Sequence, residues 1–581
     1  MRNFRVALAQ INVTVGDLDA NTNKILENIA NARDSGSDLV VFPELAVTGY
    51  PPEDLILKNH FLHDNLSCVE KIIQESKDIA VVCGFVDYDI DTFNAAIFAS
   101  NGKLIDTYRK IYLPNYGVFD EERYFRAGQQ ISIYEINGSK IAINICEDIW
   151  QPTGPLITQR QAGAELIVNI NGSPFHRNKR SVIDKMLSTR AADNGVFISY
   201  VNMVGGQDEL VFDGSSAIYN FEGSKINEAK RFEEDLLVTD IDLESVENSR
   251  LHDLRTRKRA AVEFPVNSDL DLIQVPKFPK KVVPPNVSMR KSQPYDELSE
   301  IYNALKLGTR DYVRKCGFEK ALIALSGGID SSLVAAIAVD ALGKDNVMGV
   351  AMPSRYSSKG SVDDATKLSK NLQIELLNIP IETMFSEFLK SLSLHFDPSK
   401  DVSMAEENLQ SRIRGTLMMA LSNQFGWIVL TTGNKSEMGT GYATIYGDMA
   451  GGFAVIKDVP KLLVYDLCNH INKKAGTELI PSEIIQKPPS AELRPNQRDD
   501  DSLPIYSILD PILEAYIEHD QSSNAIEELG FLRSDINKIV SLVDNSEYKR
   551  RQSPPGIKIT SRSFGRDRRM PIANRYKNIF N

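Results

Sequence analysis

Three segments with the character of β-strands each end in a residue that can take part in covalent chemistry. Glu44 follows LVVFP, Lys110 follows LIDTYR, and Cys146 closes KIAINIC. Each residue alone is unremarkable, because a buried cysteine is inert in most proteins. Together, a thiol, a carboxylate and an ammonium group can provide a nucleophile, a base for the thiol proton and a charge that stabilises an oxyanion. This set suits attack on an amide carbon with release of ammonia.

The order and spacing of these residues in VVFPELAVTGY, YRKIYLPNYGVFDEERYF and NICEDIW resemble the Glu-Lys-Cys triad of the nitrilase family. The resemblance implies that Cys146 is the nucleophile, Glu44 the base and Lys110 the electrostatic stabiliser. Glu121 in VFDEER matches a second family carboxylate that orients the site, although a solvated acidic turn is the alternative.

Some nitrilase relatives are glutaminases, and they supply candidates for glutamine binding. The matching positions in this chain are Tyr116, Glu147, Ser173 and Lys179. The assignment at Lys179 stays open, because the neighbouring Arg180 could instead bind the α-carboxylate of glutamine with two hydrogen bonds.

A glycine-containing loop is the second chemical motif. ALIALSGGIDSSLVAAIAV places residues 326–328 between an apolar strand and a helix, where backbone N–H groups can face an anion closely. The loop lacks G-x-x-x-x-G-K-[ST], so ordinary P-loop chemistry is not supported. A tight turn is the plainer alternative, but it leaves Asp330, Ser331 and Ser332 at the helix start unexplained. We therefore predict a phosphate site, with Asp330 placed to hold Mg²⁺.

The strand, S-G-G-x-D-S and helix together resemble the loop of ATP pyrophosphatases, which adenylate a carbonyl group and release pyrophosphate. Downstream, TTGNKSEMGTGYATIYGD follows the strand WIVLTT, and the resemblance narrows to the NAD synthetases. It implies that ATP is bound by Leu325, Ser326, Gly327, Gly328, Ile329, Asp330, Ser331, Ser332, Thr432, Lys461 and Ser490. It also implies that Asp330 and Glu437 hold the metal, and that deamido-NAD is bound by Asn408, Arg412, Glu437 and Lys549.

The chain departs from the short, ammonia-using NAD synthetases near YGD. Those relatives carry a lysine before this motif and an aspartate after it, where this chain has Ile445 and Gly452. The resemblance therefore assigns no substrate contacts to residues 445–458. The closing SFGRDRRMPI is either a solvated basic tail or a positive surface for the pyrophosphate of a dinucleotide.

The elements that position these residues alternate between strands and helices up to about residue 245. Residues 20–34, 55–76 and 177–194 have helical periodicity, and Asn101-Gly102 and Asn137-Gly138 predict two-residue hairpin turns. Strands are expected at FRVALAQ, DLVVFPE, IAVVCGF, NAAIFAS, KIAINIC, ELIVNI and VFISYVN. This pattern favours layered sheets covered by helices. With the nitrilase resemblance, it implies an αββα sandwich.

Strands and helices alternate again after residue 296, which predicts a doubly wound parallel sheet resembling the Rossmann-like fold of the ATP pyrophosphatases. The expected elements include a helix that ends at Gly343 and a long helix over 406–422, and helices dominate beyond residue 460. Between the halves, proline and lysine recur without helical or strand periodicity. We expect an α/β chain with domains 1–245 and 296–581 and a linker over 246–295.

Composition limits the classes of function. With 581 residues, the chain is long enough for two large domains. Its net charge of −12 disfavours a nucleic-acid substrate. Its five cysteines are scattered without a C-x-x-C pair, which fits a reducing compartment. No signal peptide or membrane-spanning run is apparent. We expect a cytoplasmic enzyme that acts on small molecules.

A nitrilase-like half followed by an NAD synthetase-like half is the arrangement of the glutamine-dependent NAD synthetases, which the chain resembles outside the linker. The resemblance implies that glutamine is hydrolysed, that ATP adenylates deamido-NAD, and that ammonia displaces AMP in the last step of NAD biosynthesis. It also implies a homo-oligomer. Joining two chemistries in one chain predicts an interior passage for ammonia.

Two other functions remain open from the sequence. An amidotransferase could perform both half-reactions on another nucleotide or carboxylate acceptor. A carrier or sensor could bind adenine nucleotide without turnover, although the set of Glu44, Lys110 and Cys146 argues against it.

Overall fold

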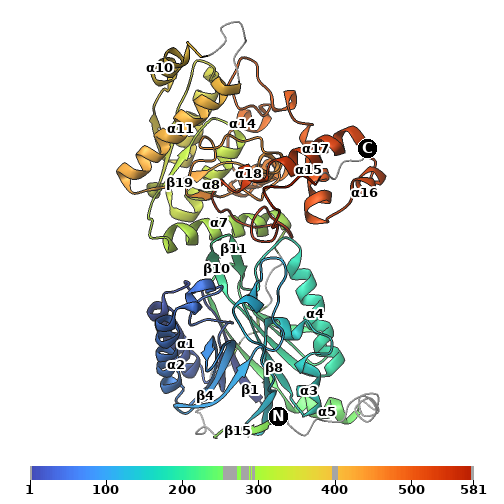
Figure 1. Ribbon diagram of the computed structural model, residues 1–581. Coiled ribbons are helices and arrows are strands. Elements are labelled where there is room, and N and C mark those ends of the chain that lie inside the picture. The colour runs from blue at the N-terminus through green and yellow to red at the C-terminus, as the bar shows by residue number, and fades with distance from the viewer. Residues whose placement is uncertain are drawn as a thin grey trace. The chain divides into compact units, whose positions relative to one another are not determined.

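A computed structural model describes residues 3–252, 271–276, 287, 289–290, 295–395 and 404–576 (Figure 1). The chain divides into two compact units. The N-terminal unit comprises Met1–Gln207 and Val211–Pro294, and the C-terminal unit comprises Asp208–Leu210 and Tyr295–Asn581. Within the described ranges, none of the helices has both the length and the apolar character that crossing a membrane requires.

Two large mixed sheets form the N-terminal unit. The first, in the order β14-β1-β2-β3-β4-β5, consists of Asp235–Asp242, Asn3–Gln10, Leu39–Val41, Ala80–Tyr88, Thr92–Ser100 and Lys103–Arg109. The second, in the order β13-β12-β9-β8-β7-β6-β15, consists of Lys225–Glu228, Ala217–Tyr219, Phe197–Asn202, Leu166–Asn171, Ser139–Ile145, Ser132–Ile136 and Asp271–Gln274. A separate hairpin joins β10 (Val204–Gln207) to β11 (Leu210–Asp213).

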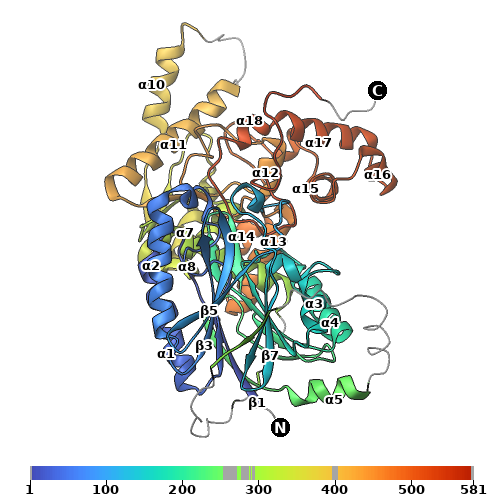
Figure 2. The same ribbon diagram turned by 60° about the horizontal axis from the view of Figure 1, so that its bottom comes forward.

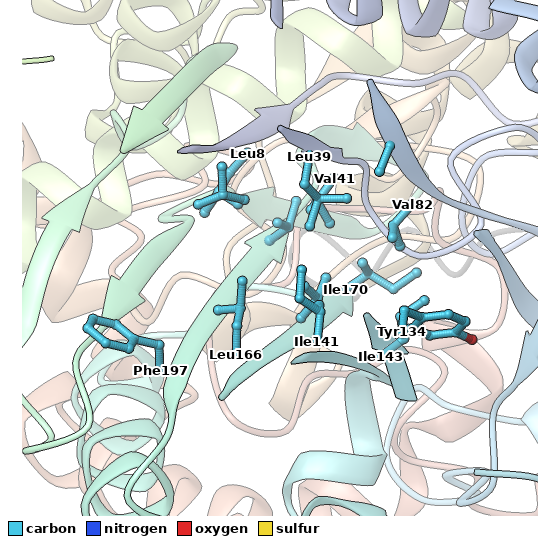
Figure 3. Close-up of a cluster of buried hydrophobic side chains, with 14 of the residues drawn as sticks. Leu8, Leu39, Val41, Val82, Tyr134, Ile141, Ile143, Leu166, Ile170 and Phe197 are labelled. Carbon is cyan, nitrogen blue, oxygen red and sulfur yellow. The ribbon is translucent and has the colours of Figure 1, made fainter. Parts of the chain in front are cut away.

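The two sheets pack face to face around an apolar core. Figure 3 shows Leu8 and Val41 of the first sheet lying opposite Ile141 and Leu166 of the second. Helices cover the outer faces in Figures 1 and 2: α1 (Leu18–Asp34) and α2 (Asn59–Glu75) on one side, and α3 (Pro155–Gln161) and α4 (Lys179–Asn194) on the other. The expected αββα sandwich is confirmed.

Both predicted hairpin turns are present. Asn101 and Asn137 have φ of 51°, and the glycines that follow them have φ of 73° and 84°. Both central residues thus adopt the left-handed conformation of a type I′ turn, which asparagine and glycine tolerate best. These turns join β4 to β5 and β6 to β7. They position Lys110, which follows β5, and Cys146, which follows β7.

Residues 246–295 contain more regular structure than expected. Helix α5 spans Glu244–His252, and β15 pairs in parallel with β6, with Leu272 opposite Ile133. A four-residue edge strand is stabilised by its neighbour in the sheet, and local periodicity does not report such a partner. The remainder of this segment lies outside the described residues, apart from 275–276, 287, 289–290 and 295.

The C-terminal unit contains the predicted parallel sheet. Its order is β18-β17-β16-β19-β20, from Glu375–Asn378, Val347–Ala351, Ala321–Ala324, Ile428–Thr431 and Phe453–Ala454, and every pairing is parallel. Helix α8 (Ile329–Leu342) packs against β16 and β17, and α11 (Met404–Phe425) packs against β16 and β19. The carboxyl ends of β16 and β19 therefore lie side by side, as a ligand site in a doubly wound sheet requires.

Helices dominate the rest of this unit, as predicted. They are α7 (Glu297–Lys315), α9 (Lys359–Leu372), α10 (Glu382–Leu392), α12 (Lys435–Thr440), α13 (Lys461–Ala475), α14 (Ser482–Gln486), α15 (Tyr506–Leu513), α16 (Ser523–Glu528), α17 (Arg533–Asn545) and α18 (Glu547–Arg550). Leu509 and Ile512 of α15 pack with Ile536 and Val540 of α17 in a second core. This core supports α12, which contains Glu437.

Candidate active sites

Cys146 lies at a sharp bend in the N-terminal unit. It is the first residue of the short helix η3 (Cys146–Ile149), directly after β7, and its φ is 43°. A non-glycine residue in this left-handed region is strained, and such strain is concentrated at functional sites. Burial, followed by the charge of Glu44, raises the pKa of the Cys146 thiol, while Lys110 opposes the rise. The resting group is therefore a thiol that needs a base.

Lys110 and two carboxylates form a buried cluster beside this thiol. The Lys110 Nζ lies 2.7 Å from Glu44 Oε1 and 2.9 Å from Glu121 Oε1. Burial favours the neutral amine, but Glu121 and Glu44 outweigh it and raise the pKa of Lys110. Burial also raises the pKa of Glu121 to about 7. The structure thus brings together the residues expected from three separate strand ends.

The sequence alone did not identify the residues that hold this cluster in place. Asn94 of β4 donates to Glu44 Oε1 at 2.8 Å and to Glu121 Oε2 at 3.2 Å. The Gly172 backbone N–H donates to Glu44 Oε2 at 2.7 Å, and the Tyr50 hydroxyl donates to Glu121 Oε1 at 3.0 Å. A polar residue at the start of the apolar segment NAAIFAS was the one available signal for Asn94.

A cavity of about 390 Å³ adjoins the two expected glutamine ligands Tyr116 and Glu147. The Tyr116 hydroxyl donates to Glu147 Oε2 at 2.8 Å, and Gln151 donates to Glu147 Oε1 at 3.1 Å. The cavity lining consists of Ile111, Tyr112, Leu113, Pro114, Asn115, Tyr116, Glu122, Ala127, Glu147 and Gln151. A carboxylate thus faces a space that a small amino acid can fill.

Ser173 and Lys179, the other glutamine candidates, do not line this cavity. The Ser173 backbone N–H donates to Asn202 Oδ1 at 2.9 Å, and Lys179 Nζ donates to the Pro174 carbonyl at 2.6 Å. Arg180 turns into the interior, where it pairs with Asp184 at 2.7 Å. The fold thus uses the Arg180 guanidinium for internal ion pairing.

In the C-terminal unit, the glycine loop joins β16 to α8. Gly327 has φ of 76°, and a Cβ at this position would lie 2.2 Å from the Ser361 carbonyl oxygen. No side chain caps the N-terminus of α8 at Gly328. The first N–H groups of α8 are therefore left for an anion. The hydroxyls of Ser331 and Ser332 donate to the Gly328 carbonyl at 2.9 Å and 2.8 Å, which stabilises the loop.

Two expected metal ligands and an ammonium group gather beside this loop. Lys461 forms an ion pair with Asp330, and its Nζ lies 4.0 Å from Glu437 Oε1. Asn434 donates to Asp330 Oδ1 at 2.9 Å and caps the N-terminus of α12. Burial, followed by the negative charge of Asp330, raises the pKa of Glu437.

This excess of negative charge suits a hard cation. Among the described residues, no group of three or more His, Cys, Asp or Glu side chains is arranged to hold a metal ion. Mg²⁺ needs fewer protein ligands, because it is commonly held by one or two carboxylates together with substrate phosphates and water. Asp330 and Glu437 therefore fit a magnesium ion that is bound together with a nucleotide.

The remaining ATP candidates lie at two places. Thr432 directly follows β19, at the same sheet edge as the glycine loop. Ser490 accepts from the Glu492 backbone N–H at 3.1 Å, and Glu492 Oε1 accepts from the Ser361 hydroxyl at 2.6 Å. Since Ser361 contacts Gly327, the loop that contains Ser490 is connected to the glycine loop.

Three expected deamido-NAD ligands converge on residues 441–445, which follow α12. Thr444 donates to Asn408 Oδ1 at 2.9 Å, and Arg412 Nε donates to the Ile445 carbonyl at 3.2 Å. Lys549 Nζ donates to the Gly441 and Ala443 carbonyls at 2.7 Å and 2.9 Å. Residues separated by more than a hundred positions in the sequence thus meet beside Glu437.

The fold and clusters define the class: a carbon–nitrogen hydrolase unit joined to an NAD synthase unit. The carbon–nitrogen hydrolase family model matches residues 5–251, and the NAD synthase model matches residues 301–553. Glutamine-dependent NAD(+) synthetases of Thermotoga maritima and Aquifex aeolicus are each 47% identical, over 99% of this chain and 100% of theirs. The chain belongs to the glutamine-dependent NAD(+) synthetases.

Solved structures agree with this assignment. The glutamine-dependent NAD+ synthetase of Acinetobacter baumannii, solved in complex with adenosine diphosphate, is 38% identical. Its TM-score is 0.75, and the match covers 99% of each chain. The enzyme of Cytophaga hutchinsonii shares the fold, with a TM-score of 0.80 over 98% of each chain at 20% identity.

Proposed function

We propose that this chain hydrolyses glutamine to glutamate and ammonia, adenylates deamido-NAD with ATP, and forms NAD with release of AMP and pyrophosphate. This would be the last step of NAD biosynthesis. The observation that carries the proposal is that one chain contains both the buried Lys110–Glu44 pair beside Cys146 and the uncapped helix start after the glycine loop.

The direct test is to incubate the purified chain with deamido-NAD, ATP, Mg²⁺ and glutamine and to identify the products by mass spectrometry. We expect glutamate, NAD, AMP and pyrophosphate. Formation of ADP and orthophosphate would contradict the assigned ATP chemistry, and turnover with another acceptor in place of deamido-NAD would contradict the assigned substrate.

Glutamine hydrolysis begins at Cys146. Glu44 takes the thiol proton as Sγ attacks the amide carbon, and Lys110 stabilises the negative oxygen of the tetrahedral intermediate. Glu44 then returns the proton to the nitrogen as the C–N bond breaks and ammonia leaves. Water, deprotonated by Glu44, hydrolyses the thioester to glutamate. Glu121 orients Lys110 throughout, because it contacts the same ammonium group.

The cavity beside Tyr116 would hold the amino acid part of glutamine. Glu147, held by Tyr116, suits the α-ammonium group. Lys179 is kept as the proposed partner of the α-carboxylate, which requires that its Nζ leave the Pro174 carbonyl and turn toward the cavity. Ser173 lies next to Gly172, which bonds the base Glu44. Arg180 is less suited to the substrate, because it is occupied by Asp184 and Glu228.

ATP would bind with its phosphates against the glycine loop and the first turn of α8. The contacts are proposed to come from Leu325, Ser326, Gly327, Gly328, Ile329, Asp330, Ser331, Ser332, Thr432, Lys461 and Ser490. Asp330 and Glu437 would hold Mg²⁺, which supplies positive charge to the phosphates during adenylation. Lys461, which pairs with Asp330, would add a second positive charge beside the phosphates.

Deamido-NAD would lie along residues 441–445. Asn408, Arg412 and Lys549 already contact this segment, and Glu437 lies in α12, which directly precedes it. The nicotinate carboxylate attacks the α-phosphorus of ATP and pyrophosphate leaves. Ammonia then attacks the adenylated carbonyl and AMP leaves. The second step needs ammonia in its neutral form, so we propose that it reaches the adenylate without mixing with solvent.

The working organisation is proposed to be a glutaminase domain over residues 1–245, a linker over 246–295 and a synthetase domain over 296–581, assembled as a homo-oligomer. All five cysteines are free, which supports a reducing cytoplasmic environment. The partners would be small molecules only, with no nucleic acid or membrane partner.

A further inference from the structure

Asp148 forms an unusually complete set of hydrogen bonds beside the glutaminase cluster. It lies in η3 and is fully buried. Its Oδ2 accepts from the Ile145 backbone N–H at 3.0 Å and from the Tyr108 hydroxyl at 2.8 Å. Its Oδ1 accepts from the backbone N–H groups of Ile111 and Tyr112 at 3.2 Å and 2.9 Å. Each carboxylate oxygen therefore has two donors.

These donors belong to the two strand ends that carry catalytic groups. Ile145 precedes Cys146, whereas Ile111 and Tyr112 follow Lys110. Strand β7, which leads to Cys146, lies in the seven-stranded sheet, and β5, which leads to Lys110, lies in the six-stranded sheet. Because β5 and β7 lie in different sheets, no backbone hydrogen bonds between these strands set the distance from the Cys146 thiol to the Lys110 ammonium group. The Asp148 carboxylate bonds directly to both ends.

We infer that Asp148 is a positioning residue that holds the Cys146 bend and the Lys110 strand end in register across the two sheets, so that Lys110 faces the oxyanion formed at Cys146. This inference rests on the proposed roles of Cys146 and Lys110. Asp148 acts through these residues and contacts neither the thiol nor the Lys110 ammonium. An error of about 1 Å in such an arrangement can reduce a rate by about a hundredfold.

Asp148→Asn is the first test. The amide keeps one acceptor oxygen but presents its NH₂ group to donors, so two of the four bonds are lost. We expect kcat for glutamine-dependent NAD synthesis to fall about a hundredfold, the KM for glutamine to change less than about threefold, and ammonium-dependent synthesis to persist.

Glu165→Gln is the matched control. Glu165 is a buried carboxylate that accepts from the Lys140 backbone N–H at 2.8 Å, near the opposite end of β7. It should leave glutamine use within about twofold of the unmodified chain. Equal losses in both variants, or unchanged kcat in Asp148→Asn, would overturn the inference.

A second test needs no variant at Asp148 itself. Burial raises the pKa of Asp148 to about 6, against the lowering effects of its backbone donors, Tyr108 and Lys110. The carboxylate form makes the four bonds, so the register is lost as pH falls through about 6. Among the described residues, Lys110, whose raised pKa keeps it protonated, and Tyr108 are the titratable side chains with the largest influence on this carboxylate.

Tyr108→Phe removes one bond to the carboxylate and leaves the three backbone bonds. It should raise the pKa of Asp148 and move the acid limb of the glutamine-dependent rate to higher pH by about one unit. Glu121 has no bond to Tyr108 and its own titration should not move. If the acid limb of the glutamine-dependent rate in Tyr108→Phe stayed at the same pH, the inference would be overturned, even if Asp148→Asn failed to fold.

Failure of this inference can be told apart from failure of the proposed function. If Cys146→Ala retained glutamine use, the assigned nucleophile would be wrong. If Cys146→Ala were inactive with glutamine while Asp148→Asn and Tyr108→Phe matched the unmodified chain, the positioning role alone would be wrong.

Discussion

The two candidate sites are built in different ways. At the glutaminase site, the catalytic side chains bond to one another in the interior, with Lys110 held 2.7 Å from Glu44 and 2.9 Å from Glu121. At the synthetase site, the helix start after Gly328 has no side-chain cap, and Asp330 is partly exposed. Covalent catalysis by a cysteine requires the catalytic side chains to be arranged before the substrate binds. Adenylation instead requires hydrogen-bond donors that stay unpaired until the phosphates of ATP bind them.

The two sites also differ in how closely their lysine pairs with the carboxylates. Lys110 lies between two carboxylates, and their charges hold its pKa above the usual value despite burial. In the other site, Lys461 pairs with Asp330 but its Nζ lies 4.0 Å from Glu437 Oε1, and burial, followed by the charge of Asp330, raises the pKa of Glu437. Lys110 thus bonds to both of its carboxylates, whereas Glu437 lies too far from Lys461 for a hydrogen bond and suits a bound cation. A substitution in one site should therefore leave the chemical step at the other site intact.

The largest difference between glutamine-dependent and ammonium-dependent NAD synthesis is expected for Cys146→Ala. Loss of the nucleophile should reduce glutamine-dependent NAD synthesis at least about a thousandfold, whereas synthesis from a high concentration of ammonium salt should stay within about threefold. The two rates are measured on one preparation, so ammonium use also reports that the chain is folded. Equal loss of activity with both nitrogen sources would show that Cys146 does not serve glutamine hydrolysis alone.

Asp330→Asn should affect both nitrogen sources equally. The variant removes a negative ligand for Mg²⁺ and the partner of Lys461, so adenylation should fall about a hundredfold whichever source supplies the ammonia. Exchange of labelled pyrophosphate into ATP measures this step. The control is Asp345→Asn, an exposed carboxylate beyond the end of α8, which should have no effect. A loss confined to glutamine-dependent synthesis would contradict the proposed role of Asp330 in adenylation.

Gly327→Ala tests whether the phosphate site depends on backbone geometry. The added Cβ would lie 2.2 Å from the Ser361 oxygen at a φ of 76°, so the loop must shift. We expect the KM for ATP to rise at least about tenfold. Gly360→Ala, whose nearest contact would be 3.8 Å away, is the control and should be neutral. A normal KM for ATP in Gly327→Ala would contradict the loop assignment.

The smallest effect is expected for Lys549→Ala. Lys549 holds the Gly441 and Ala443 carbonyls, so its loss should loosen the segment that also contacts Asn408 and Arg412. The KM for deamido-NAD should rise about tenfold, and the KM for ATP should change less than about twofold. Lys538→Ala on the exposed face of α17 serves as the control. An equal rise for both substrates would mean that Lys549 supports the fold alone.

The sequence predicted the parts of this molecule that local pattern determines. Alternating strands and helices, the Asn-Gly turns and the glycine loop are all local, and the structure contains them. Strand β15 was missed because its stability comes from pairing with β6. Asn94 and Asp148 were missed because their partners lie far away in the sequence or across two sheets. Asn434 was a missed local signal, since N-x-x-E marks a helix cap.

Nitrogen released at Cys146 should become the amide of NAD. An isotope experiment would show this: the chain is supplied with amide-nitrogen-15 glutamine, deamido-NAD, ATP and Mg²⁺ together with an excess of unlabelled ammonium at moderate pH. We expect the NAD amide to carry the label with little dilution, because ammonia released into water would be mostly protonated and unreactive. Label diluted to the level of the ammonium pool, or absent from NAD while glutamate accumulates, would contradict it.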